Sequence, residues 1–135
     1  LGVGVTAYGV LARGLISGHW SADRLGANDF RAYDPRFSED NVEQNLALVS
    51  KLREVASQLG VSVAQAAVAW VAAQGDDIVP LIGARTRDRL TESLGAVDIT
   101  LTAEQLAAIE DAVPKGAAAG DRYNAAQMAL LDSER

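Results

Sequence analysis

The sequence has no cysteine, a single histidine and three prolines, and these scarcities exclude several kinds of site. Without cysteine the chain can form no disulfide, thiolate nucleophile or zinc–thiolate centre. His19 has no cluster of metal-ligating residues near it in the sequence, so a place in a loop or a pocket wall is expected rather than a metal or triad role. No metal site is therefore predicted.

Basic residues are also scarce, since 12 of them face 18 acidic residues for a net charge of -6 and a pI near 4.6. Nucleic acids and anionic membrane surfaces bind basic proteins, so neither is an expected partner. The sequence has no apolar run of about 18 residues to span a bilayer, and no signal peptide opens it. A cytoplasmic protein is predicted.

The 135 residues, 49% of them hydrophobic, are enough for one domain with a packed core. The chain begins with Leu1 rather than Met and runs directly into the small apolar residues 2–7. A domain seldom begins on a buried strand, so we expect the chain to be a fragment of a longer protein.

Strands and helices alternate in the predicted pattern, which favours an α/β fold with parallel strands. Residues 3–8 and 78–82 predict strands buried on both faces, with Pro80 near a strand end because it lacks a backbone donor. Two strands do not form a stable sheet by themselves, so further strands must come from elsewhere. Helices are predicted over residues 39–59, 62–71, 86–94 and 102–113, with Ser38 as an N-cap and capping boxes at Ser62-x-x-Gln65 and Thr102-x-x-Gln105.

Two irregular regions complete the pattern. Residues 14–37 form a connection long enough to indicate a functional or mobile loop. Within it Trp20 is a candidate for the substrate pocket or for an anchor that fixes the loop, and Asp34 and Arg36 are expected to pair or cap locally. Residues 115–135 are expected to wrap over the body as a tail.

A glycine turn follows the first predicted strand and suits a phosphorylated ligand with a flat ring. Tyr8 stands at the strand's carboxyl end, where its ring can stack on a planar heterocycle. Gly9 and Gly14 allow backbone N–H groups to approach a phosphate. An ordinary strand–helix loop explains the same residues equally well.

The turn after the second predicted strand is more specific. Gly83 permits close approach of a ligand, and Arg85, Arg87 and Arg89 gather where Thr86 opens a helix. Cations are unfavourable at a helix N-terminus unless an anion binds there, and the guanidinium group suits phosphate. The alternative is a solvated charged face whose arginines pair with Asp88 and Glu92.

Together the two turns resemble segments of the aldo-keto reductase family. Residues 8–18 are similar to its tyrosine-x-proline-leucine-x-x-glycine segment after the seventh barrel strand, and residues 79–93 to its isoleucine-proline-glycine-x-basic segment after the eighth. Residues 122–134 also resemble the carboxyl tail of bacterial members. The resemblance implies the carboxyl-terminal part of a (β/α)8 TIM barrel, with the last two strand–helix units and the tail, and it implies NADP(H) as cofactor.

The resemblance implies that Tyr8 stacks on the nicotinamide ring and that Gly9, Leu11 and Gly14 line the pyrophosphate site. Arg85 and Arg89 hold the 2′-phosphate, which favours NADP over NAD because a doubly charged group prefers paired cations. Four positions depart from the family pattern, namely Gly9, Val10, Ile82 and Ser93. The implied cofactor-binding residues are Tyr8, Gly9, Val10, Leu11, Arg13, Gly14, Ile82, Gly83, Ala84, Arg85, Thr86, Arg89, Glu92 and Ser93.

The activity implied is the reduction of a small-molecule aldehyde or ketone to an alcohol. The family's catalytic aspartate, tyrosine, lysine and histidine lie in its first four strand–loop units, to which nothing in this chain corresponds. No catalytic residue is therefore assigned, and the chain by itself is expected to be inactive. Two alternatives stay open, a non-catalytic NADP(H)-binding, redox-sensing subunit of the same superfamily and a truncated product that does not fold.

Overall fold

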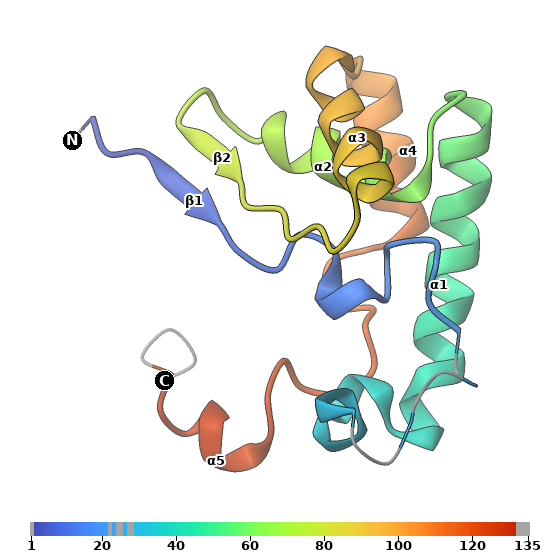
Figure 1. The fold of residues 1–135 in the computed structure, drawn as a ribbon, viewed down its shortest axis with the longest axis vertical. Helices are drawn as coiled ribbons and strands as arrows, with labels where there is room; N and C mark the ends of the chain where they lie inside the picture. The colour runs from blue at the N-terminus through green and yellow to red at the C-terminus, as the bar shows by residue number, and fades with distance from the viewer. Residues whose placement is uncertain (1, 22, 24–25, 27–28, 132–135) are drawn as a thin grey trace.

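The computed structural model describes residues 2–21, 23, 26 and 29–131. Leu1 and residues 132–135, where the predicted tail motif ends, lie outside the described residues. In chain order the elements are β1 (Val5–Ala7), η1 (Ala12–Gly14), η3 (Phe30–Tyr33), η4 (Pro35–Phe37), α1 (Glu39–Gln58), α2 (Val63–Ala72), β2 (Ile78–Pro80), α3 (Arg87–Leu94), η5 (Gly95–Asp98), α4 (Ala103–Ala112) and α5 (Ala125–Met128) (Figure 1).

The strands β1 and β2 pair in parallel, as predicted, with Thr6 opposite Val79. Pro80 is the last residue of β2, so its missing N–H falls where the ladder ends. Beyond it the Leu81 amide donates to the Ala7 carbonyl oxygen at 3.0 Å. Because the strands are parallel and in register, Tyr8 and Leu81 leave the sheet at the same edge.

The predicted burial of both strands is wrong for this chain. Both strands are shorter than expected, and Val5 and Val79 are 49% and 56% exposed. The helix α2 packs against β2, and among the described residues no second layer or further strand covers the rest of the sheet. Apolar strand residues indicate what a sheet can bury, and these valines lack the neighbours that would bury them.

The helices begin close to the predicted positions because their caps are encoded locally. Both capping boxes form, with the Ser62 and Thr102 side chains each accepting from the backbone N–H of the glutamine three residues on. Thr86 caps α3 in the same way. Ser38 stands at the N-cap of α1, but its hydroxyl donates to the Pro35 carbonyl oxygen at 3.0 Å instead of capping the helix.

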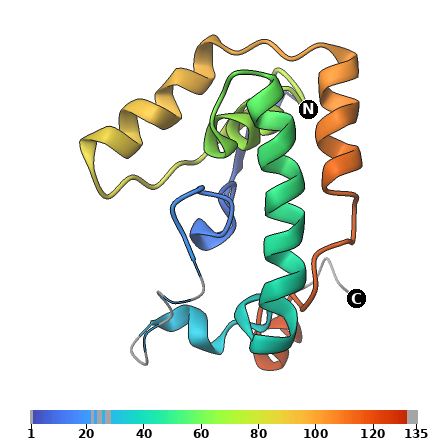
Figure 2. The same cartoon turned by 90° about the vertical axis from the view of Figure 1, so that its right-hand side faces the viewer.

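The helix α1 is the centre of the packing, with α2 and α4 against it, as Figures 1 and 2 show from two sides. Its buried face joins residues from the long loop and from α2 and α4 in one core. No single described helix is long and apolar enough to cross a membrane, and α1 and α2 meet that test only jointly across an 85° bend. The core consists of Leu15, Trp20, Phe37, Val42, Val49, Leu52, Ala56, Val63, Ala66 and Ile109.

The tail returns to the body of the molecule, as predicted, and also forms the short helix α5. Its connection to α1 depends on Asn45, which is only 2% exposed. The Asn45 side-chain amide donates to the carbonyl oxygens of Arg36 and Ala119, both at 2.9 Å, and its oxygen accepts from the Ala119 amide at 2.8 Å. One side chain therefore joins α1, η4 and the tail.

We expect Asn45→Ala to loosen the tail, because it leaves two partly buried carbonyl oxygens and one amide without their Asn45 partner. Each unsatisfied group costs about 1–3 kcal/mol. The measurement is hydrogen exchange of the Ala119 amide, which should become much faster than in the wild type. Lys51→Ala, at an exposed position of the same helix, is the control, and equal exchange rates in Asn45→Ala and Lys51→Ala would contradict the role of Asn45.

Candidate cofactor-binding site

A cavity of about 560 Å³ opens where β1 and β2 end. That volume lies within the range of small-molecule and cofactor sites, and the carboxyl ends of parallel strands are where such sites form. Of the predicted residues Ile82, Ala84 and Thr86 are not in its wall, while Thr86 caps the adjoining helix α3. The wall consists of Tyr8, Gly9, Val10, Leu11, Arg13, Gly14, Ser17, His19, Trp20, Phe30, Arg31, Ala64, Leu81, Gly83, Arg85, Arg89, Glu92 and Ser93.

The segment after β1 is a tight turn in an unusual backbone conformation. Gly9 and Gly14 have φ of 81° and 97°, and between them Ala12 and Arg13 also have positive φ, 46° and 57°. Residues with a side chain rarely adopt such angles, so the surroundings must stabilise them. The turn is closed by amides donating to carbonyl oxygens, from Ala12 to Gly9 and from Gly14 to Leu11, both at 2.8 Å.

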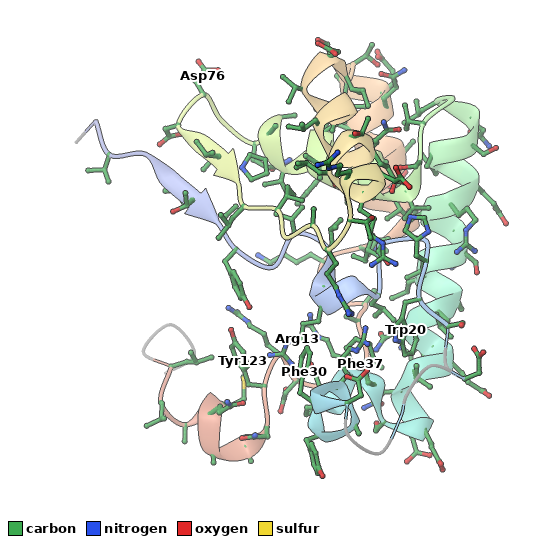
Figure 3. The ribbon with its side chains drawn as sticks, in the orientation of Figure 1. Arg13, Trp20, Phe30, Phe37, Asp76 and Tyr123 are labelled. Atoms are coloured by element: carbon green, nitrogen blue, oxygen red, sulfur yellow. The ribbon has the colours of Figure 1, made fainter. Side chains whose placement is uncertain are left out.

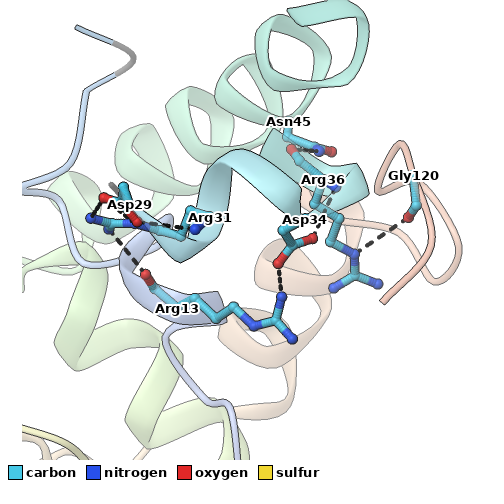
Figure 4. A network of polar contacts seen from close by, with 7 residues as sticks. All are labelled: Arg13, Asp29, Arg31, Asp34, Arg36, Asn45 and Gly120. Carbon is cyan, nitrogen blue, oxygen red and sulfur yellow. Dashed lines mark hydrogen bonds and ion pairs between the residues drawn. The ribbon is translucent and has the colours of Figure 1, made fainter. Parts of the chain in front are cut away.

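An arginine from the long loop holds this turn in place (Figure 4). Nη1 of Arg31 donates to the Arg13 carbonyl oxygen at 3.3 Å, and its Nε donates to Asp29 at 2.9 Å. The guanidinium group also lies within 6.0 Å of the ring centres of three aromatic residues. The residues with these rings are Trp20, Phe30 and Phe37.

A second ion pair fixes the side chain of Arg13. Its Nη1 pairs with Asp34, whose side chain is only 3% exposed, and its guanidinium carbon lies 5.0 Å from the centre of the Tyr123 ring (Figure 3). Asp34 caps η4 as predicted by accepting from the Arg36 amide, but the arginine that it pairs with is Arg13. The sequence analysis predicted neither the Asp29–Arg31 pair nor the Arg13–Asp34 pair.

The Asp29–Arg31 pair predicts a pH dependence of stability. Hydrogen bonds from the side chain and backbone of Arg31 lower the pKa of Asp29 from 3.8 to about 2. A carboxylate with a lowered folded-state pKa stabilises the fold above its unfolded pKa, and this contribution is lost as the pH falls toward 2. Urea unfolding of the natural full-length protein between pH 2 and 6 should show a smaller pH dependence in Asp29→Asn than in the wild type. Parallel curves would contradict the prediction.

The segment after β2 brings cations to the N-terminus of α3. Arg85 and Arg89 line the cavity, whereas Arg87 does not. None of the three pairs with a carboxylate in the part of the chain that the structure describes, and Glu92 pairs with His19 instead. At Gly83 an added Cβ would meet no atom within 4 Å, so the backbone there adjoins open space. Two guanidinium groups lie beside a helix N-terminus, next to backbone that adjoins open space. This arrangement is chemically suited to bind a phosphate group.

His19 and Glu92 form a contact that the sequence did not reveal. Nε2 of His19 lies 3.0 Å from Oε2 of Glu92, across the cavity wall from the long loop to α3. Burial raises the pKa of Glu92, but hydrogen bonds to His19 and Ser62 and the charges of His19 and Arg89 outweigh it, and the pKa falls below its usual value. Glu92 therefore stays ionised and joins the two segments. His19 occupies a pocket wall, as predicted.

Trp20 combines the two roles that were open for it. Its ring meets Phe37 edge-on, with centres 5.1 Å apart, and the residue is only 9% exposed, so it fixes the loop in the core. It also lines the cavity with the candidate cofactor residues. Its indole N–H has no hydrogen-bond acceptor among the described residues.

Comparison with known proteins agrees with this arrangement. The model of the aldo/keto reductase family matches residues 1–114. The chain belongs to this family. It is 35% identical over 134 residues to an aldo-keto reductase of Strobilurus tenacellus, and the match covers 98% of this chain and 40% of that protein. It is 33% identical over 120 residues to an aldo-keto reductase of Schizosaccharomyces pombe whose name includes NADP(+), with 88% of this chain and 35% of that protein covered.

Among solved structures, the glycerol dehydrogenase of Gluconobacter oxydans matches with a TM-score of 0.73 and 34% identity. The match covers 81% of this chain and 33% of the dehydrogenase. The chain thus spans between a third and two fifths of the length of the relatives described here. The predicted family and fold class, an α/β part of a (β/α)8 barrel, are confirmed.

Proposed function

We propose that this chain is the carboxyl-terminal, NADP(H)-binding part of an oxidoreductase that reduces aldehydes or ketones to alcohols. The observation that carries the proposal is the convergence of Tyr8, Gly83, Arg85 and Arg89 on one cavity from segments more than 70 residues apart. The relatives are named as reductases or a dehydrogenase, and one of these names includes NADP(+). The missing length relative to them would contain the catalytic residues, and the location would be cytoplasmic.

Each residue has a distinct part in this proposal. The bound cofactor supplies the hydride, and the chain determines where its reactive ring lies. Tyr8 is 77% exposed at the end of β1, so one face of its ring can stack on the nicotinamide. The turn from Gly9 to Gly14 follows the pyrophosphate, and Arg85 and Arg89 bind the 2′-phosphate at the N-terminus of α3.

Two further segments position the binding groups. The network of Arg31 and Asp29 keeps the turn in its left-handed conformation, so the backbone need not reorganise when the cofactor binds. Trp20 and the His19–Glu92 pair close the wall between the phosphate and nicotinamide ends. The proton for the product alcohol comes from outside this chain.

The proposal is tested by titrating the natural full-length protein with NADPH and following the nicotinamide fluorescence. We expect saturable binding and NADPH-dependent reduction of a simple aldehyde. Failure of NADPH to bind would overturn the proposal. Binding without reduction of any aldehyde or ketone would restrict the protein to cofactor binding.

Tyr8→Ala should weaken NADPH binding roughly tenfold, because a stacked aromatic pair is lost together with the apolar area that it covers. Tyr8→Phe keeps the ring and is the matched control, with an affinity close to that of the wild type. The dissociation constants are measured by the same fluorescence titration. Equal affinities of Tyr8→Ala and Tyr8→Phe would show that the ring does not stack on the nicotinamide.

A further inference from the structure

Arg13 is the point where the turn after β1 meets the tail. Its φ of 57° follows a φ of 46° at Ala12, so two successive residues with side chains lie in the left-handed region. Residues of this kind stay in that region only when their surroundings fix them. Arg13 lines the cofactor cavity and also a second cavity of about 280 Å³, which shares Tyr8 and Gly9 with the first. The contacts of its side chain therefore bear directly on the shape of the turn.

The long loop holds Arg13 at two points. Its carbonyl oxygen accepts a hydrogen bond from Nη1 of Arg31 at 3.3 Å, and its guanidinium group pairs with Asp34. The Asp34 side chain is 3% exposed, whereas that of Arg13 is 26% exposed. The pair is thus buried at the carboxylate and partly open at the arginine. A partner on the open side strengthens the pair, because charges attract each other more strongly where water is excluded.

The tail supplies this partner. The guanidinium carbon of Arg13 lies 5.0 Å from the centre of the Tyr123 ring (Figure 3). A cation near the face of an aromatic ring is attracted by the ring itself, so this attraction does not need the hydroxyl group. Tyr123 also lines the second cavity, together with Tyr8 and Gly9. The Arg13 side chain is therefore enclosed between a carboxylate of the loop and a ring of the tail.

The backbone of the tail is fixed shortly before this ring. The Gly120 carbonyl oxygen accepts from Nε of Arg36 at 3.4 Å (Figure 4). An added Cβ at Gly120 would lie only 2.6 Å from the Pro35 carbonyl oxygen, so the tail and η4 are in close backbone contact. Tyr123 follows three residues later. Its ring is therefore presented to the turn from an anchored backbone.

We propose that Tyr123 is a positioning residue for cofactor binding, which acts through Arg13 and keeps the turn after β1 in the conformation that receives the pyrophosphate. This inference rests on the proposed function, because it takes the turn from Gly9 to Gly14 as part of the NADP(H) site. Tyr123 is not in the wall of the cofactor cavity, so its effect on the cofactor passes through the turn. Since linkage is reciprocal, a cofactor that requires the ordered turn also favours the docked tail.

The first test compares NADPH dissociation constants by fluorescence titration of the natural full-length protein. Tyr123→Leu removes the ring but keeps an apolar side chain, and we expect it to weaken NADPH binding about fivefold. Tyr123→Phe keeps the ring and should bind NADPH as the wild type does. Tyr33→Leu is the control, because Tyr33 is 77% exposed and lies outside both cavities. Equal NADPH affinities of Tyr123→Leu and Tyr123→Phe overturn the inference and leave the proposed function standing.

Adenosine 2′-monophosphate separates positioning of the turn from a general loss of structure. It contains the 2′-phosphate that Arg85 and Arg89 bind in the proposed function, but neither the pyrophosphate nor the nicotinamide. Its affinity should be the same in Tyr123→Leu and in the wild type, and equal losses for NADPH and this fragment overturn the inference. In a protein that already carries Arg13→Gln, Tyr123→Leu should cause no further loss of NADPH affinity. A full fivefold loss in that background shows that Tyr123 does not act through Arg13.

Hydrogen exchange tests the same contact without a cofactor. The amides of Ala12 and Gly14 close the turn, and they should exchange faster in Tyr123→Leu than in Tyr123→Phe. NADPH added to the wild type should slow exchange of the Tyr123 amide. Equal exchange of the turn amides in the two variants overturns the inference. If the wild type binds no NADPH, the proposed function fails, whereas faster exchange in Tyr123→Leu alone still supports the contact between tail and turn.

Discussion

Replacing Arg85 and Arg89 together by alanine is expected to weaken NADPH binding about 100-fold in the natural full-length protein. A hydrogen bond to a charged group contributes about 1.5–3 kcal/mol, and two such contacts to one phosphate are coupled, so about 3 kcal/mol is a reasonable total. NADH has no 2′-phosphate, and its affinity should therefore change little. The expected signature is a loss of preference for NADPH over NADH.

Arg87→Ala is the matched control, because this third arginine of the same helix end lies outside the cavity wall. Its NADPH affinity should stay close to that of the wild type. The dissociation constants for both cofactors are measured for all three proteins. Equal losses for NADPH and NADH in the double variant would show that the arginines do not recognise the 2′-phosphate.

Phe37→Ala should lower the free energy of unfolding by about 3–5 kcal/mol, the usual loss for a buried phenylalanine. Phe37 is 3% exposed, meets Trp20 edge-on and lies beside the Arg31 guanidinium group. The substitution leaves a void at the point where the long loop joins the core. Because Arg31 also holds the Arg13 carbonyl oxygen, the left-handed turn of the cofactor site should loosen as well.

Phe30→Ala is the control for this effect, since Phe30 belongs to the same loop but is 64% exposed. Its loss should be below about 1 kcal/mol, as for most surface substitutions. The measurement is urea unfolding of the natural full-length protein followed by tryptophan fluorescence. Similar unfolding midpoints for Phe30→Ala and Phe37→Ala would mean that the loop is not fixed through Phe37.

The helices of this protein were predictable because their signals are local. Each helix start depends on residues within one turn of the chain. All three predicted caps form, namely the capping boxes at Ser62 and Thr102 and the N-cap at Thr86. The two candidate segments were predictable for a similar reason, since each follows a strand directly. Parallel pairing of those strands then brings Tyr8 and Leu81 to the same edge.

The polar network was not predictable in the same way. Arg13 and Asp34 are 21 positions apart and joined by an irregular loop, so no periodicity relates them. The sequence suggested that Asp34 and Arg36 pair or cap locally, and the local cap forms. Only the path of the loop brings the Asp34 carboxylate to the Arg13 side chain. The prediction that both strands are buried was wrong for a related reason. Burial of a strand depends on the layers that pack against it, and the described residues do not provide those layers.

β1 and β2 pair only with each other among the described residues, so each has one edge whose backbone donors and acceptors face no strand. Edges of this kind recruit strands from other molecules, above all where the flanking side chains are apolar, as Val5 and Val79 are. A preparation limited to these residues would therefore tend toward self-association and aggregation. Lysine at either position would act as a gatekeeper against it.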